Sequence, residues 1–193
     1  MSEQPNRNAS HAVTPNPRGA SVGVGTELQF GPFERSVRLS RPRLQTFDYR
    51  GPHAYHVVTV VRNRAPVFTD IKIGQWCISI LEDVAAGADF DLLAFCLMPD
   101  HLHLLARGRN DSSHLVTLLQ RFKRRTAFHF KRQFGNQLWQ DSYYDRVLRR
   151  DEDLQEVVDY ILLNPVAEGL CSRPGDYPLS GGIHAVPTPD GPN

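Results

Sequence analysis

Two predicted strands separated by only two residues set the strongest constraint on how this chain can fold. Leu92 to Met98 is a run of apolar residues, and the second run, His101 to Arg107, carries leucines and an alanine among its two histidines and arginine. Pro99 and Asp100 lie between the two runs, and this pair is typical of a tight turn. The sequence therefore predicts two antiparallel strands joined as a hairpin.

The other predicted elements alternate between strand and helix on either side of this hairpin. We expect a strand at Tyr55 to Val61, a helix within Phe68 to Ala86, a long helix from Ser113 to about Phe134, a short strand near Asp145 to Leu148 and a last helix from Asp151. The last helix should end near Asn164, because a proline disfavours helical geometry in the residue before it.

This order of elements, β-α-β-β-α-β followed by a further helix, predicts an α+β fold. It is the order of a ferredoxin-like split βαβ domain with an antiparallel sheet, and the additional C-terminal helix carries Tyr160.

The chain divides into one domain, residues 51–170, and two terminal segments. Residues 1–50 are rich in Pro, Gly, Ser and Asn without sustained apolar periodicity, which predicts a mobile tail. Its end, Phe33 to Arg50, is either a solvated linker or a basic arm that contacts phosphate. Residues 171–193 are rich in Pro and Gly, so we expect no regular structure there.

Composition excludes several classes of protein. The chain of 193 residues has 22 Lys and Arg against 21 Asp and Glu, so it does not coat nucleic acid by bulk charge. It lacks an apolar run of about 18 residues and a signal peptide, which predicts a soluble, cytoplasmic protein without a membrane partner. Its 3 cysteines have no CxxC spacing, which argues against a disulfide framework or a thiolate zinc site.

The second strand of the hairpin carries two histidines. Alternation in a strand sends His101 and His103 to one face and Leu102 and Leu104 to the other. Two neighbouring imidazoles suit a divalent cation, and the alternative is a pair of histidines that simply face solvent.

The last predicted helix carries Tyr160 and Asn164, which are four residues apart and therefore share one face. Both lie at the border of the apolar stripe, where a tyrosine either takes part in chemistry or packs with its hydroxyl in solvent.

The long predicted helix is basic throughout. It contains no acidic residue, its aromatic residues include Phe122, Phe128 and Phe130, and its charged residues are Arg121, Lys123, Arg124, Arg125, Lys131 and Arg132. Such a mixture favours contact with a nucleic-acid backbone over a helix face that is merely solvated. The sequence has no P-loop, which argues against a nucleotide cofactor.

Four segments, in this order, resemble the REP-associated tyrosine transposases, relatives of the single-tyrosine HUH transposases of bacterial insertion sequences. They are Phe95 to Leu105, which resembles "vMPNHvHLl"; Leu119 to Arg124; Leu138-Trp139-Gln140 with Tyr143-Tyr144-Asp145, which resembles "lWq…yyd"; and Tyr160 to Val166 with Gly169-Leu170, which resembles "YIhlNPvraGlv". Two positions depart from the family pattern: Asp100 replaces the usual Asn, and Ala167-Glu168 replaces a common Arg-Ala pair.

The resemblance implies an enzyme that cleaves and rejoins single-stranded DNA beside hairpin-forming repetitive extragenic palindromes. Tyr160 would be the nucleophile, and His101, His103 and Asn164 would hold Mg²⁺ or Mn²⁺. The protein would associate with the nucleoid as a monomer or a homodimer. Two other functions stay open: an inactive module that binds hairpin DNA, and a metal-dependent nuclease that uses water.

Overall fold

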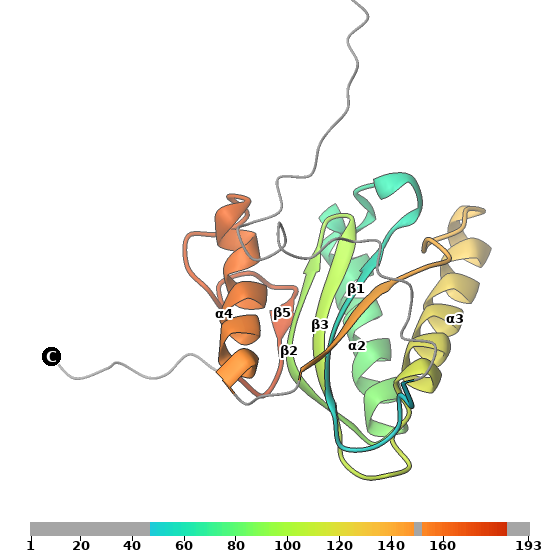
Figure 1. The fold of residues 1–193 in the computed structure, drawn as a ribbon. Helices are drawn as coiled ribbons and strands as arrows, with labels where there is room; N and C mark the ends of the chain where they lie inside the picture. The colour runs from blue at the N-terminus through green and yellow to red at the C-terminus, as the bar shows by residue number, and fades with distance from the viewer. Residues whose placement is uncertain (1–46, 149–151, 185–193) are drawn as a thin grey trace, which may run out of the picture.

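A five-stranded antiparallel sheet forms the centre of the computed structural model, which describes residues 47–148 and 152–184 (Figure 1). The strands are β1 (Ala54–Val60), β2 (Phe90–Met98), β3 (His101–Gly108), β4 (Tyr144–Leu148) and β5 (Ser180–Gly181). Their order in the sheet is β4-β1-β3-β2-β5. Most of the predicted N-terminal tail and basic arm, and residues 185–193, lie outside the described residues.

Three α-helices accompany the sheet in the described part of the chain. They are α2 (Ile71–Ala86), α3 (Leu115–Phe134) and α4 (Glu152–Ala167), and two short 3-10 turns, η1 (Arg62–Arg64) and η2 (Val67–Thr69), precede α2. The predicted order of elements from the first strand to the last helix is therefore confirmed. Among the described residues, no helix is long and apolar enough to cross a membrane.

The helices lie on both sides of the sheet (Figure 1). Helices α2 and α3 pack against each other, and α2 packs on β2. Helix α4 also contacts β2, and it reaches β3 from the opposite face, where its Tyr160 meets His103. Side chains such as Leu102 and Leu104 are buried in the core between the sheet and the α2–α3 layer.

Helix α2 lies within the predicted segment Phe68 to Ala86, whereas α4 ends later than predicted. Helix α2 begins at Ile71 because the Asp70 carboxylate caps it, accepting hydrogen bonds from the backbone N–H groups of Lys72 at 2.9 Å and Ile73 at 3.4 Å. The expected end of α4 at Asn164 was wrong, since the helix includes Pro165 and continues to Ala167. Proline has no backbone N–H, so the carbonyl one turn before it lacks its hydrogen-bond donor within the helix. The loss of one hydrogen bond is small near a helix end, where several backbone groups already lack helical partners.

The expectation that residues 171–193 lack regular structure was also wrong for the part that is described. Strand β5 pairs with β2, and the backbone N–H of Leu97 donates to the carbonyl of Leu179 at 2.9 Å. The side chains of Tyr177 and Leu179 are buried. The prediction failed because a two-residue strand has no periodicity of its own and forms only where β2 offers an edge.

We expect Leu179→Ala to lower the free energy of unfolding by about 2 to 4 kcal/mol, because it removes a fully buried side chain and leaves a cavity. Ile183→Ala is the matched control: its side chain is 57% exposed, so the change should cost less than about 0.5 kcal/mol. Urea unfolding of both variants measures the difference. Equal effects would show that the C-terminal segment is not part of the folded domain.

Candidate active site

His101 and His103 face the same side of β3, as the alternation predicts. Their cross-strand partners on β1 are Val60 and Val58, and their partners on β2 are Met98 and Cys96. The two Nε2 atoms lie 2.9 Å apart, a hydrogen bond in which one imidazole donates and the other accepts. The two rings therefore direct a pair of nitrogens toward one point.

Asp100 and Arg64 hold the outer histidine of this pair. Nδ1 of His101 lies 2.5 Å from Oδ1 of Asp100, and Oδ2 of the same carboxylate accepts from Arg64 Nη1 at 2.9 Å. Burial acts to raise the pKa of Asp100, but the hydrogen bonds and charges of His101 and Arg64 outweigh it and lower this pKa. A carboxylate on Nδ1 of a histidine fixes the ring and leaves Nε2 to face the site.

His103 is buried, and its surroundings favour the neutral form. Burial, with smaller contributions from His101 and His56, lowers the pKa of His103 well below its usual value. Its Nδ1 is buried and has no hydrogen-bond partner within the described residues. A neutral imidazole keeps a lone pair, which is the form that binds a metal ion.

Tyr160 reaches this pair from the opposite layer. Its ring meets the ring of His103 edge to face, with centroids 5.5 Å apart at 89°, and it meets His56 at 6.0 Å and 76°. The helix that carries it, α4, lies over β2 and β3, so the tyrosine and the histidines come together only through tertiary packing.

Asn164 lies one turn after Tyr160 on α4. Its Nδ2 donates to the backbone carbonyl of Tyr160 at 2.8 Å. With the amide nitrogen engaged in its own helix, the side-chain oxygen is the atom left for a ligand. The structure thus joins His101, His103 and Tyr160 through their side chains, and it joins Asn164 to Tyr160 through the backbone.

His56 on β1 is a site residue that the sequence analysis missed. Its side chain is buried, and its ring stacks on that of His103 with centroids 5.9 Å apart at 18°. Burial, followed by the positive charge of Arg146, lowers the pKa of His56 to about 4. A histidine inside the apolar run of the first strand was the available signal, but it gave no hint of the register that places His56 beside His103.

The six basic residues of α3 lie in the other layer, and the structure does not bring them to Tyr160. All of them except the half-buried Lys123 are exposed. Three of the six bond to other parts of the chain: Arg121 donates to the carbonyl of Gly87, Arg125 pairs with Asp83 of α2 at 3.4 Å, and Lys123 Nζ donates to the carbonyl of Gln140 at 2.5 Å. The charge of the helix is thus partly compensated from outside it.

Comparison with known proteins identifies the family of the chain. Residues 51–163 match the family model described as "Transposase IS200 like". The chain belongs to this family. Membership of a transposase family implies that the protein is an enzyme.

Two similar sequences are named as REP-associated tyrosine transposases. The one from Haemophilus influenzae is 32% identical over 69% of this chain and 81% of its own length. The one from Escherichia coli is 28% identical over 47% of this chain, and the match spans 53% of its length. A solved structure of a REP-associated tyrosine transposase bound to a REP hairpin has the same fold, with a TM-score of 0.61 at 20% identity, over 72% of this chain and 82% of that one.

The lowered pKa of Asp100 predicts a pH-dependent contribution to stability. A carboxylate whose pKa falls below 3.8 on folding stabilises the folded state above that pH, and the contribution disappears as the pH falls through the folded-state pKa. Asp100→Asn should therefore lower the free energy of unfolding on the order of 1 to 3 kcal/mol at pH 7 and progressively less below pH 3.8.

Chemical denaturation of both proteins between pH 7 and pH 3 measures this effect. Asp83→Asn, which breaks an exposed ion pair, is the control and should cost less than about 1 kcal/mol. A loss in Asp100→Asn that is the same at every pH would contradict the assignment.

Proposed function

We propose that this protein cleaves and rejoins single-stranded DNA beside hairpin-forming REP sequences, with Tyr160 as the nucleophile. The observation that carries the proposal is the edge-to-face contact of Tyr160 with His103, whose Nε2 lies 2.9 Å from that of His101. Family membership and the similarity to REP-associated tyrosine transposases support the class of substrate.

The reaction exchanges one phosphodiester for another. The Tyr160 oxygen attacks phosphorus, the bond to the 3′ oxygen breaks, and the phenol proton is lost while the 3′ oxygen gains one. The products are a 5′-phosphotyrosine and a free 3′-OH. Because the number of phosphodiester bonds is unchanged, a new 3′-OH can reverse the step without an energy source, in agreement with the lack of a P-loop.

The residues at the site fit a divalent ion. His101, His103 and the Asn164 oxygen would hold Mg²⁺ or Mn²⁺, and imidazole ligands favour Mn²⁺ in vitro. Within residues 47–148 and 152–184, no group of three His, Cys, Asp or Glu side chains could hold a metal ion, so the proposed set depends on the Asn164 oxygen as its third ligand. Such an ion supplies Lewis-acid polarisation of a phosphate oxygen.

The chain's own residues prepare the site for this chemistry. Burial lowers the pKa of His103 and so favours the neutral imidazole, the form that binds a metal ion. Asp100 accepts from Nδ1 of His101 and directs the other ring nitrogen inward. Asn164 is tied to the backbone of the residue that attacks, so the position of its amide follows that of Tyr160.

Tyr160→Phe should abolish a covalent protein–DNA adduct formed with labelled single-stranded REP hairpins in Mn²⁺, because it removes only the attacking oxygen. His101→Ala should slow adduct formation about 100-fold or more, and EDTA should have the same effect. A denaturing gel measures the adduct.

The same gel separates the two other functions. Cleavage that persists in Tyr160→Phe would indicate a nuclease that uses water. Tight binding that is indifferent to metal, without any adduct, would indicate an inactive hairpin-binding module.

The exposed cations of α3 are the proposed contacts with the DNA backbone. Arg124→Gln should weaken hairpin binding and reduce the slope of log K against log salt by about 0.7 to 0.9, the value for one phosphate contact. Arg125→Gln should have a smaller effect, because Asp83 already pairs with that guanidinium. Fluorescence anisotropy at several salt concentrations compares them, and an unchanged slope for Arg124→Gln would refute the contact.

A further inference from the structure

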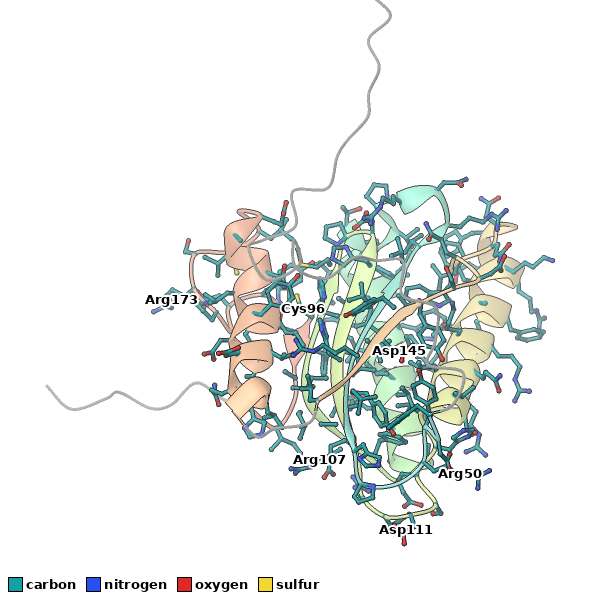
Figure 2. All side chains as sticks on the ribbon, in the orientation of Figure 1. Arg50, Cys96, Arg107, Asp111, Asp145 and Arg173 are labelled. Atoms are coloured by element: carbon teal, nitrogen blue, oxygen red, sulfur yellow. The ribbon has the colours of Figure 1, made fainter. Side chains whose placement is uncertain are left out.

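Strand β4 brings two polar side chains to the face of the sheet that carries the candidate active site. Arg146 is the cross-strand partner of His56, and Tyr144 is the partner of Val58, which in turn pairs with His103. Directly opposed residues in an antiparallel pair point to the same face. Arg146, Tyr144 and His56 therefore share a face with His103, while Asp145 (labelled in Figure 2) points to the other one.

His56 is the buried centre of this group. Only 3% of its surface is exposed, and its Nε2 has no hydrogen-bond partner within the described residues. Its ring contacts Tyr160 at 6.0 Å and Tyr144 at 6.4 Å between centroids. A buried imidazole nitrogen without a partner is costly, and a ligand that bonds to it removes that cost.

Arg146 brings a positive charge close to His56. Arg146 is half-buried, and its charge is strong enough at His56 to help lower the pKa of that imidazole. A neutral histidine still offers an N–H donor, and a guanidinium binds phosphate oxygens through a planar set of donors. An N–H donor beside a guanidinium is suited to a phosphodiester.

The position of the group relative to Tyr160 decides which phosphate it meets. The Tyr160 ring contacts both His103 and His56, and His101 lies on the other side of His103 along β3. The proposed metal ligands and the His56–Arg146 pair therefore flank the attacking tyrosine. A strand with its scissile phosphate at His101 and His103 would extend past Tyr160 toward Arg146.

We propose that His56 and Arg146 form a second phosphate-binding site, which holds a phosphodiester of the bound single strand next to the one that Tyr160 attacks. This inference rests on the proposed function. A phosphate-binding site at His56 and Arg146 would also guide the DNA from the α4 side of the sheet toward the α2–α3 layer. β4 is an edge strand, and a hollow lined by Lys123, Arg124 and Tyr143 lies where α3 meets the segment leading into β4.

A binding experiment that requires neither metal nor chemistry tests the second site. The protein carries Tyr160→Phe, EDTA is present, and single-stranded hairpin oligonucleotides carry one neutral methylphosphonate at successive positions. Arg146→Gln should weaken binding of the unmodified strand about tenfold. At one linkage next to the cleavage position, the methylphosphonate should weaken binding to the parent protein, which carries Tyr160→Phe alone, by the same factor as Arg146→Gln does. In the protein that also carries Arg146→Gln, the same methylphosphonate should cause no further loss of affinity.

Two further variants and a control complete the test. Arg146→Lys should restore part of the lost affinity, because it keeps the charge but not the planar donors. His56→Gln should bind better than His56→Phe, since only the former keeps a hydrogen-bonding side chain. Arg173→Gln, which breaks an exposed ion pair with Asp176, should leave affinity unchanged. If the His56 variants do not fold, the Arg146 variants decide the test.

The inference is overturned if the methylphosphonate lowers affinity by the same factor in the parent and in Arg146→Gln at every position. Failure of the proposed function would be recognised differently, as a missing adduct with unmodified protein and metal. Because the binding assay uses no reaction, the two failures are distinguishable.

Discussion

The register of β3 against its two neighbours is the constraint on which the rest of the structure depends. The Pro99-Asp100 turn is so short that Met98 must pair with His101 and Cys96 with His103. Alternation then sends Leu102 and Leu104 into the core and both imidazoles to the opposite face. A shift by one residue would reverse both sets. The interactions that bury the core therefore also build the candidate active site.

Burial gives the clustered histidines their chemical character. His103 and His56 lie where an imidazolium would lose its hydration, so the neutral form is favoured at both positions. Asp100 differs because Arg64 and His101 both contact its carboxylate, which stays ionised. The family pattern has an amide at this position, and the carboxylate found here is a stronger acceptor for the His101 ring.

The sheet separates two surfaces that a bound strand would have to connect. Tyr160 is part of α4, which packs on the face of the sheet that carries His101 and His103, whereas the exposed cations of α3 belong to the α2–α3 layer. Figure 1 shows α4 apart from α2 and α3. The histidines belong to β1 and β3, the central pair of strands. In Figure 2 the labels Asp145 and Cys96 mark β4 and β2, the strands that flank this pair within the sheet. Edge strand β4 lies between the two surfaces, and this position gives Arg146 its importance in the proposed path of the DNA.

The sequence by itself determined the features that depend on local periodicity. These are the order of strands and helices, the hairpin, the common face of His101 and His103, and the stacking of Tyr160 on Asn164 one helical turn apart. Each follows from neighbours within a few residues, so a single strand or helix is enough to specify it.

Only the tertiary structure decided which of these elements meet. Strand β5 exists because β2 offers an edge, and Arg125 is compensated because α2 lies beside α3. His56 and Arg146 are cross-strand partners only because β1 pairs with β4 in one register, and His56 contacts Tyr160 only because α4 packs on that face. Contacts between distant segments depend on strand pairing and on the choice of sheet face, and no local pattern specifies either.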